Sequence, residues 1–367
     1  MSRTAATAQA HPNIALIKYW GNRDQALRLP SNPSLSMNMG GLTTTTTVEF
    51  DPSLTADVVV LGGRTIGGPG RERVVRLLDQ VRQLCGSTSH RTAHTQWVQV
   101  LRGASVATKQ SSGPSGDCFA DSARNDFTHL HAHVNSRNEF PAGAGLASSA
   151  SGFAALAVAA SAAAGLSLNE ADLSRLARRG SGSACRSVPG GFVEWTMGDD
   201  DRSSYAYSIA PAEHWDLHDV VALIDLGHKA VGSTEGHAVA DTSPLQAARV
   251  ASVPDRLAKA RSAVLDRDFA ALAEVVELDS LMMHAVMITS SPVLMYWQPA
   301  TIAVMQAVTD WRREGLPACA TIDAGPNVHV LCPASAALEV ADRLRRITGV
   351  KRIVTAHAGG PARLLPD

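Results

Sequence analysis

Cysteine is scarce in this sequence of 367 residues, and its spacing is irregular. The five cysteines are Cys85, Cys118, Cys185, Cys319 and Cys332, and no two of them form a Cys-x-x-Cys pair. An odd and scattered set of thiols argues against a disulfide framework and against a cysteine-based zinc site. A fold held together by disulfides and a fold built around a cysteine-bound zinc ion are therefore both excluded.

An excess of charge of either sign is also absent. Lys and Arg total 33, Asp and Glu total 34, and the net charge is −1. No broad field favours nucleic acid or an anionic membrane surface, so an anionic ligand must be held by local groups. No apolar run approaches the ~18 residues of a membrane-spanning helix, and the first twenty residues lack the pattern of a signal peptide. We expect a cytoplasmic protein that binds neither nucleic acid nor membrane.

The hydrophobic content of 45% is enough to bury a large core in one big domain or two ordinary ones. Strand-like runs occur at 13–20, 34–39, 43–50, 57–63, 219–227, 318–325 and 328–333, and helical periodicity at 71–85, 151–166, 167–180, 243–287, 299–315 and 334–348. Their irregular order predicts an α+β fold instead of a regular βαβ series. We place a domain boundary in the charged turn at 198–204, which gives an N-terminal domain over 1–200 and a C-terminal domain over 201–367.

The segment 86–128 is rich in Ser, Thr, Gly and His and has weak periodicity, which indicates an irregular insertion or a mobile loop. His129, His131 and His133 then alternate with apolar residues at strand spacing. Three histidines on one face could bind a metal, but no nearby carboxylate or cysteine completes a ligand shell. The solvent-facing side of a half-buried strand explains the alternation equally well.

The stretch 138–153, NEFPAGAGLASSASGF, places glycines and serines between a strand and an alanine-rich helix. A strand, a glycine loop and a helix bring unpaired backbone N–H groups to one point, which suits phosphate. Ser148 and Ser149 could add hydroxyl contacts or hold Mg²⁺. The stretch is not a Walker A loop, because no Lys follows its last glycine, and it does not fit GxGxxG. Taken alone, it is as compatible with a flexible joint as with a phosphate site.

Six motifs in fixed order decide between these readings. They are HPNIALIKYWGNRD, LPSNPSLSMNM, FPAGAGLASSASG, RRGSGSACRSVPGGFVEW, DTSP and ATIDAGPNVHVL. This set resembles the ATP-dependent mevalonate diphosphate decarboxylase family of the GHMP small-molecule kinase superfamily. The Gly/Ser loop is typical of the superfamily, and SGSACRS together with DAGPN is typical of the decarboxylase branch. The resemblance covers most of the chain apart from the segment 86–128.

The resemblance implies a two-domain α+β GHMP kinase fold, with ribosomal S5 domain 2-like and ferredoxin-like layers and the active site in the cleft between the domains. It implies ATP and Mg²⁺ as cofactors and a phosphorylated mevalonate as substrate. Homodimers are common in the family, and no feature of this sequence identifies a dimer interface. The ATP phosphates would be held by Gly143, Gly145, Leu146, Ala147, Ser148 and Ser149, with the two serines as expected Mg²⁺ contacts.

Members of the family phosphorylate the tertiary 3-hydroxyl of the substrate with ATP and then expel phosphate and CO₂ to leave an alkene. By resemblance, Asp323 acts on the hydroxyl and Lys18 lies beside Asp323. Arg186 would hold the substrate carboxylate with its planar guanidinium. Tyr19, Asn22, Ser181, Ser183 and Ser233 match further substrate-side positions. Because this mechanism needs no covalent enzyme intermediate, we expect Cys185 to be a packed side chain.

One position departs from the pattern of the family. Decarboxylases of the 5-diphosphate usually read KYWGKRD, whereas this chain reads KYWGNRD, with Asn22 in place of Lys. The missing cation favours mevalonate 5-phosphate, which yields isopentenyl phosphate; the alternative is mevalonate 5-diphosphate, which yields isopentenyl diphosphate. A mevalonate 3-kinase that stops at phosphorylation is disfavoured because Lys18, Arg186 and Asp323 are all present. A non-catalytic ligand sensor is disfavoured because the aspartate and the glycine loop are both intact.

Overall fold

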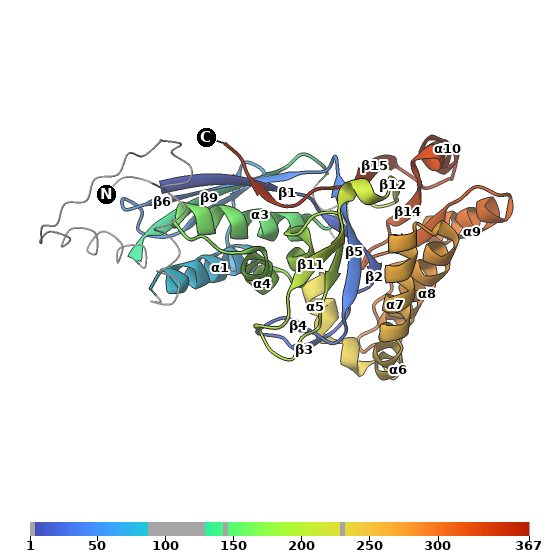
Figure 1. The fold of residues 1–367 in the computed structure, drawn as a ribbon, viewed down its shortest axis with the longest axis horizontal. Coiled ribbons are helices and arrows are strands. Elements are labelled where there is room, and N and C mark those ends of the chain that lie inside the picture. Colours follow the sequence, from blue (N-terminus) through green and yellow to red (C-terminus); the bar gives the residue numbers. More distant parts are fainter. Residues whose placement is uncertain (1–3, 87–128, 142–145, 228–231, 367) are drawn as a thin grey trace, which may run out of the picture.

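The computed structural model describes residues 4–86, 129–141, 146–227 and 232–366. The insertion expected at 86–128 therefore lies outside the described residues apart from its first position. Two β-sheets with helices packed on them build an elongated molecule, with the first sheet toward one end and the C-terminal helices, beyond the second sheet, at the other (Figure 1). The α+β class predicted from the sequence is confirmed.

The first sheet has six strands in the order β16-β1-β6-β9-β7-β8. These strands are β1 (Thr4–Ala10), β6 (Thr44–Asp51), β7 (Val58–Leu61), β8 (Arg64–Thr65), β9 (His131–Asn138) and β16 (Arg363–Leu364). Side chains along β6 alternate between buried and half-buried, as a strand with one covered face requires. The covering layer consists of α1 (Gly68–Gly86), α3 (Ser148–Ala163) and α4 (Glu170–Gly180), of which α3 contacts β1 and β6 directly (Figure 1).

Helix α3 lies close to this sheet because its side chains are small. Most of its alanines are fully buried, and the Thr44 and Ser151 hydroxyls lie 2.6 Å apart where the helix meets β6. The chain leaves α3 through Gly165, whose φ of +70° is a left-handed conformation that glycine adopts without strain. Helix α4 begins after Asn169, whose side chain accepts a hydrogen bond from the Asp172 N–H at 2.8 Å. The helices predicted at 151–166 and 167–180 are thus present as α3 and α4, with α3 beginning and ending three residues earlier than predicted.

The second sheet is formed by β11-β10-β5-β15-β12-β14-β13, with β2 also paired to β5. The strands are β2 (Asn13–Ile17), β5 (Ser34–Gly40), β10 (Phe192–Trp195), β11 (Ala206–Ala210), β12 (Leu217–Leu223), β13 (Cys319–Ile322), β14 (Val328–Pro333) and β15 (Arg352–Ala358). The charged turn at 198–204 joins β10 to β11, which pair antiparallel. Strands from both sides of residue 200 thus share one sheet. A separate pair is formed by β3 (Asn22–Asp24) and β4 (Leu29–Pro30).

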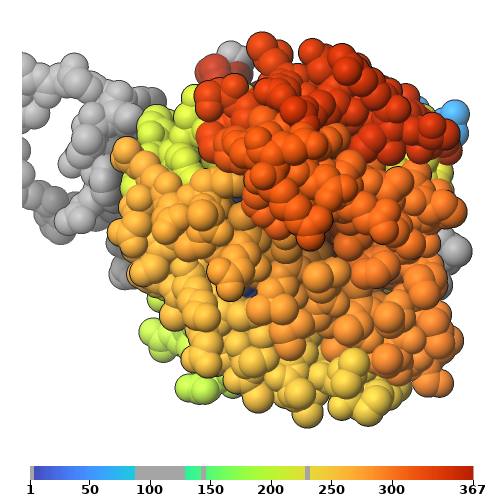
Figure 2. Space-filling model, turned by 90° about the vertical axis from the view of Figure 1, so that its right-hand side faces the viewer, coloured from blue at the N-terminus to red at the C-terminus, as the bar shows by residue number. Residues whose placement is uncertain are grey.

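Helices cover both faces of the second sheet. Leu217 and Val221 of β12 face a cluster that contains residues of α7 (Val253–Asp266) and α8 (Phe269–Ile288). Val220 and Ala222 face the opposite cluster, with α9 (Pro299–Arg313) and α10 (Ala334–Arg345). Figure 2 shows these C-terminal helices forming one end of the molecule. The remaining short helices are α5 (Ser233–Ala238), α6 (Gln246–Ala251) and the 3₁₀ turns η3 (Gly182–Ser187), η4 (Ala212–His214) and η5 (Ala240–Thr242).

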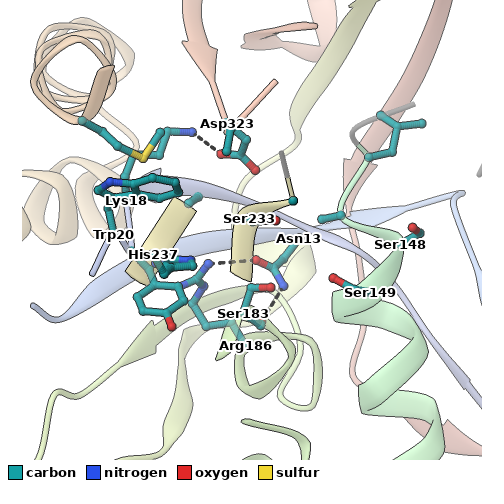
Figure 3. A pocket seen from close by; sticks show the side chains of 17 residues that line it. Asn13, Lys18, Trp20, Ser148, Ser149, Ser183, Arg186, Ser233, His237 and Asp323 are labelled. Carbon is teal, nitrogen blue, oxygen red and sulfur yellow. Dashed lines mark hydrogen bonds and ion pairs between the residues drawn. The ribbon is translucent and has the colours of Figure 1, made fainter. Parts of the chain in front are cut away.

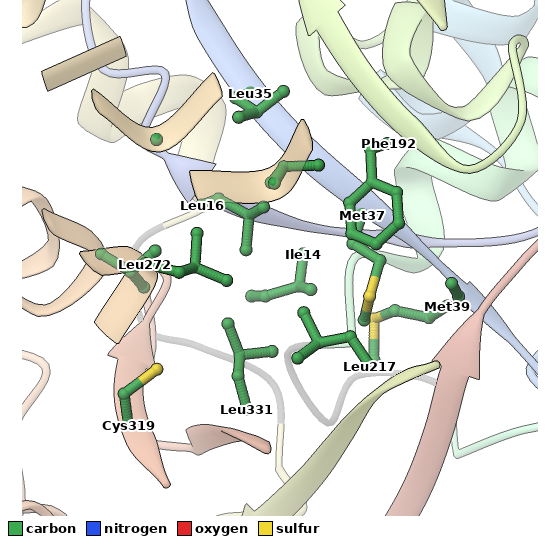
Figure 4. Close-up of a cluster of buried hydrophobic side chains, with 14 of the residues drawn as sticks. Ile14, Leu16, Leu35, Met37, Met39, Phe192, Leu217, Leu272, Cys319 and Leu331 are labelled. Atoms are coloured by element: carbon green, nitrogen blue, oxygen red, sulfur yellow. The ribbon is translucent and has the colours of Figure 1, made fainter. Parts of the chain in front are cut away.

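The largest apolar cluster lies between the second sheet and helices α7 and α8 (Figure 4). Ile14, Leu16, Leu35 and Met37 are completely buried there, and every residue of β5 is buried. Truncation of such a side chain to alanine typically costs about 2–5 kcal/mol, so this cluster fixes the strands β2 and β5 firmly. In the part of the chain that the structure describes, no helix has both the length and the apolar composition to cross a membrane.

Candidate active site

Two adjoining cavities lie between the segment that follows β2, the 3₁₀ turn η3 and helix α5. The first, of about 290 Å³, is lined by residues of β2, η3, α3, α5 and the loop after β13; the second, of about 440 Å³, extends from it toward α1. Tyr19, Ser149, Ser183, Ser233 and His237 line both cavities. One ligand can therefore reach from the first cavity into the second.

An ion pair stands at one end of the first cavity (Figure 3). Lys18, which follows β2, has its Nζ 2.7 Å from Oδ1 of Asp323, which follows β13. The lysine side chain is 1% exposed and the aspartate side chain 30% exposed, so the carboxylate is the member that a ligand can reach. A carboxylate held in this way can accept a proton from a hydroxyl, while the ammonium stabilises negative charge on the oxygen.

A buried network fixes the backbone of Lys18. The Lys18 N–H donates to Oδ2 of Asp279 at 2.6 Å, and the Lys18 carbonyl accepts from Asn32 at 3.0 Å and Arg249 at 2.8 Å. Asp279 is fully buried and also accepts from Arg256 Nε at 2.8 Å. Because both backbone polar groups are engaged, the direction in which the lysine side chain leaves the strand is set by this network.

Arg186, in η3, is a buried cation beside the same cavity. It is 3% exposed, its Nη1 donates to Ser34 Oγ at 2.5 Å, and its Nη2 donates to Asn13 Oδ1 at 3.3 Å. Burial lowers the pKa of its guanidinium. Nε has no hydrogen-bond partner, and no described carboxylate forms a salt bridge with Arg186. A buried charge without a counter-ion is costly, so this site is suited to an anionic ligand.

Asn13 accepts a hydrogen bond from Arg186 and is itself held in place by η3. Its Nδ2 donates to Ser187 Oγ at 2.7 Å and to the Ser183 carbonyl at 3.0 Å, which leaves its oxygen facing the guanidinium. These contacts join the start of β2 to η3. Sequence reasoning did not select Asn13, although its place two residues after His11 in the HPNIALIK motif is a signal that could have found it.

The serine end of the glycine-serine stretch lies across the first cavity from the Lys18–Asp323 ion pair (Figure 3). Leu146, Ala147, Ser148 and Ser149 line this cavity, whereas Gly143 and Gly145 are outside the described residues. Ala147 precedes α3 with φ +48° and offers no side-chain cap to the first turn. The N–H groups of that turn are therefore free of a capping side chain, an arrangement that suits a phosphate group.

The remaining predicted residues lie on or near the second cavity. Ser181 lines the second cavity only, and Tyr19, Ser183 and Ser233 line both. Asn22 is absent from the described lining of both cavities: it is 6% exposed, its oxygen accepts a hydrogen bond from the Tyr19 hydroxyl, and its Nδ2 donates to Gln25 Oε1 at 2.9 Å. Asn22 thus contacts a cavity residue without lining the cavity itself.

His237 of α5 is a cavity residue that the sequence reasoning missed. Its ring stacks on Tyr19 at 4.1 Å between centroids and lies 4.6 Å from Trp20. Its Nδ1 accepts a hydrogen bond from the Gly21 N–H at 3.0 Å, so the neutral ring carries its proton on Nε2. Burial, reinforced by Arg28 and Arg186, lowers the pKa of His237 to about 3. Its spacing of four residues from Ser233 on one short helix was the available signal.

His284 of α8 lies behind the ion pair. Its Nε2 is 3.3 Å from the Ile322 carbonyl, next to Asp323 in sequence, and its ring centroid is 4.9 Å from that of Trp297. Burial, followed by the charge of Lys18, lowers the pKa of His284 to about 4. The ring is therefore neutral at physiological pH and adds no second cation beside Lys18.

The described residues form neither a metal site around the histidines of β9 nor a reactive thiol at Cys185. His131 and His133 lie on the half-buried side of β9, and the described residues contain no group of three His, Cys, Asp or Glu side chains that could hold a metal ion. Cys185 is buried, and burial raises the pKa of its thiol to about 12. A thiol with this pKa is not a nucleophile at neutral pH, as the sequence predicted.

Comparisons with known proteins match nearly the whole length of this chain. Family models for the diphosphomevalonate decarboxylase-like N-terminal domain and the mevalonate 5-diphosphate decarboxylase C-terminal domain match residues 10–206 and 220–362. The chain belongs to the mevalonate diphosphate decarboxylase family. Members of this family are ATP-dependent carboxy-lyases with a GHMP kinase-like fold, and the α+β arrangement of two sheets described above matches that fold.

Individual relatives agree. A diphosphomevalonate decarboxylase of Ganoderma lucidum is 36% identical over 91% of this chain and 79% of its own length. A phosphomevalonate decarboxylase of Haloferax volcanii is 34% identical over 99% of this chain and 98% of its own length. The solved structure "MDDEF in complex with MVAPP, AMPPCP and Magnesium" superposes with a TM-score of 0.83 at 35% identity and covers all of both chains. Family membership alone does not fix the number of phosphates on the substrate, because relatives of both names occur.

Proposed function

We propose that this decarboxylase converts a 5-phosphorylated mevalonate to the corresponding isopentenyl product with ATP, and that mevalonate 5-phosphate is preferred over the 5-diphosphate. The observation that carries the proposal is that one cavity is lined both by a buried arginine without a counter-ion and by a lysine–aspartate ion pair. Arg186 is buried with neutral partners and an unpartnered Nε, and the Lys18–Asp323 ion pair lies across the cavity from the phosphate-binding end of α3. A hydroxy acid that reacts with ATP needs all three groups.

The chemistry has two steps. In the first, Asp323 takes the proton of the 3-hydroxyl, and the oxygen attacks the terminal phosphorus of ATP, releasing ADP. In the second, the bond from C3 to the phosphate oxygen breaks, and phosphate leaves with that electron pair. The electron pair of the bond between C2 and the carboxyl carbon becomes the new C=C bond, and CO₂ is released.

The chain's own residues divide these tasks. Lys18 offsets negative charge at the reacting oxygen, and Arg186 holds the carboxylate by a charge-assisted contact until CO₂ leaves. The ATP phosphates would be bound by the N-terminal turn of α3. The hydroxyls of Ser148 and Ser149 fit Mg²⁺, which takes few protein ligands and keeps water and phosphate oxygens in its shell. When bound, Mg²⁺ neutralises charge on the phosphates during transfer.

The preference for the 5-phosphate rests on Asn22. A neutral amide stands where the family pattern has lysine, and this amide is already hydrogen-bonded to Tyr19 and Gln25. Arg23 does not replace the missing cation, because its guanidinium donates to the backbone carbonyls of Met197 and Gly198 at an exposed site. The Haloferax relative named for phosphomevalonate, similar over the full length of both chains, supports the same preference.

The test is incubation of the purified protein with ATP and Mg²⁺ and with mevalonate, its 5-phosphate or its 5-diphosphate in turn. CO₂ and ADP are measured in the same samples. The proposal expects equal amounts of CO₂ and ADP with the phosphorylated substrates and a higher kcat/KM for the 5-phosphate. ADP without CO₂ would identify a kinase, and neither product from any substrate would contradict an enzymatic role on mevalonates.

A further inference from the structure

His237 is a buried, titratable residue in the wall that the two cavities share, and none of the steps proposed above uses it. Its ring packs against two aromatic side chains: the Tyr19 ring is stacked on it, and the centroid of the Trp20 ring lies 4.6 Å from its own. Its Nδ1 accepts a hydrogen bond from the Gly21 N–H at 3.0 Å. These three contacts fix the plane of the ring and the direction in which each nitrogen points.

The second ring nitrogen of His237, Nε2, is a donor without an acceptor. Because Nδ1 accepts a hydrogen bond, the neutral ring carries its proton on Nε2. Among the described residues Nε2 has no hydrogen-bond partner, and it is not one of the unpartnered polar atoms that the protein encloses completely. Nε2 is therefore open to the cavities, and its fixed N–H suits an acceptor atom on a ligand.

Arg186 indicates which ligand group this donor meets. The guanidinium of Arg186 is close enough for its charge to contribute to the lowered pKa of His237, and both residues line the first cavity. In Figure 3 the two side chains lie on the same side of that cavity, with Asp323 across from them. Arg186 forms no salt bridge with a described carboxylate, so a ligand carboxylate that pairs with it would lie beside the His237 ring as well.

We propose that the Nε2–H of His237 donates a hydrogen bond to the substrate carboxylate that pairs with Arg186. This inference rests on the proposed function, because it takes the ligand of the first cavity to be a phosphorylated mevalonate. The carboxylate then accepts from one charged donor and one neutral donor, which lie on different elements of the fold. Two such contacts fix the orientation of the carboxylate relative to C3, where the reaction takes place.

The neutral state of His237 suits a carboxylate that leaves as CO₂. In the second step the negative charge of the carboxylate passes into the rest of the substrate. A contact that is stronger before this step than in its transition state slows the step, and a second cation beside Arg186 would make such a contact. A hydrogen bond from a neutral donor is about half as strong as one from a charged donor, so it orients the carboxylate with less effect on its departure.

The experiment uses two amide side chains, each of which replaces one nitrogen of the ring. His237→Asn places its oxygen close to the position of Nδ1, so it keeps the acceptor for the Gly21 N–H and removes the donor at Nε2. His237→Gln places an N–H close to the position of Nε2 and removes the acceptor at Nδ1. His129→Asn is the control, because His129 is exposed and lines neither cavity.

Each variant is titrated by calorimetry, without nucleotide, with mevalonate 5-phosphate and with 3-hydroxy-3-methylbutyl phosphate, which has hydrogen in place of the carboxyl group. We expect His237→Asn to weaken binding of the acid by about tenfold or more, the usual effect of losing a hydrogen bond to a charged group. Its binding of the carboxyl-free ligand should stay within about threefold of wild type. KM for mevalonate 5-phosphate should rise in parallel, and KM for ATP should not. His237→Gln and the control should bind both ligands as the wild type does.

Unchanged binding of the acid by His237→Asn would overturn the proposal, and so would equal losses for both ligands, which would place the donor on another group of the substrate. A loss confined to His237→Gln would show that the ring only supports Gly21. If His237→Asn does not fold, His237→Gln decides alone, because it must keep the preference for the acid over the carboxyl-free ligand. A wild-type enzyme that releases no CO₂ from any mevalonate refutes the proposed function and this inference with it. CO₂ release by the wild type with unchanged binding in His237→Asn refutes the inference alone.

Discussion

Replacement of Asp323 by asparagine tests the proposed mechanism most directly. The amide keeps the shape of the carboxylate and can still accept a hydrogen bond from Lys18 Nζ, which lies 2.7 Å from Oδ1 in the wild type. It cannot take the proton of the 3-hydroxyl. General-base catalysis contributes ~10²–10⁴ to rate, so we expect turnover to fall by ~10³, equivalent to about 4 kcal/mol of transition-state stabilisation.

The same substitution should have a smaller effect on the free energy of unfolding, and the size of that effect follows from the exposure of the two side chains. Lys18 is 1% exposed and loses its counter-charge, which in a fully buried pair would cost about 3–5 kcal/mol. Asp323 is 30% exposed, so water already screens the pair, and the amide oxygen keeps one hydrogen bond. We therefore expect the free energy of unfolding to fall by about 1–2 kcal/mol, with the protein still folded at 25 °C.

The assay combines coupled ADP release, CO₂ release and urea unfolding of the same preparations. Asp310→Asn is the matched control, because Asp310 forms only an exposed pair with Arg313 on α9. In the double variant Lys18→Met with Asp323→Asn, the loss of turnover should be close to that of the more severe single variant, since the two residues act on one proton and one oxygen. Turnover of Asp323→Asn within tenfold of wild type would refute the role of this carboxylate.

Three further predictions concern residues around the pair. Asn22→Lys should raise kcat/KM for the 5-diphosphate relative to the 5-phosphate roughly tenfold, the ratio that ~1.4 kcal/mol of charge-assisted contact gives; a wild-type enzyme that already prefers the diphosphate tenfold would contradict the premise. Asp279→Asn leaves Arg256 and Arg249 buried without their carboxylate, so urea unfolding should show a loss of about 3 kcal/mol, and a loss below 1 kcal/mol would mean that the network is not tightly coupled. His284 has a pKa of about 4 in the folded state against 6.5 when unfolded, so protonation favours the unfolded state as pH falls from 6.5 to 4. His284→Gln should remove about 3 kcal/mol of that pH dependence in unfolding experiments at pH 7 and pH 4, and an unchanged slope would count against the burial argument.

Local sequence patterns predicted most of the elements correctly. The helices at 71–85, 151–166 and 167–180 are α1, α3 and α4, because their apolar spacing, glycine stops and caps are local signals. The single helical stretch expected over 243–287 is divided among α6, α7 and α8. The breaks fall at Ser252 and at Arg267, whose φ of +57° reverses the chain before Asp268 caps the next helix. Apolar periodicity continues across both breaks, so the pattern alone did not reveal them.

Two of the strands that were missed are held by distant partners. β10 pairs with β5, and β15 pairs with β12 and with the end of β5, at separations of more than 100 residues. A four-residue run such as Phe192–Trp195 has no intrinsic signal strong enough to identify it as a strand. Its conformation depends on the edge that β5 offers, which exists only in the folded sheet.

The candidate site shows the same division. The place of Lys18 beside Asp323 was expected from the resemblance, and in the structure Lys18 Nζ lies 2.7 Å from Asp323 Oδ1. Arg28, Arg73 and Arg76 line the second cavity, and they escaped notice because arginines on a helix face or in a turn are ordinarily solvated. Only the cavity that they share distinguishes them. His237 was missed for a related reason: its neutral state follows from burial against Tyr19 and Trp20, which no local pattern encodes.

The shared second sheet has a consequence for how the protein loses its structure. β5 pairs with β10 and β2 from the first half of the chain and with β15 from the second half, so strands from both sequence halves are its hydrogen-bonding neighbours. Detachment of the C-terminal half would expose an edge of β5 and the apolar cluster of Ile14, Leu16 and Leu35 together. Neither half is an independent unit of stability, and we expect the whole chain to melt in one cooperative transition. The ion pair across the two halves then disappears with that transition and not before it.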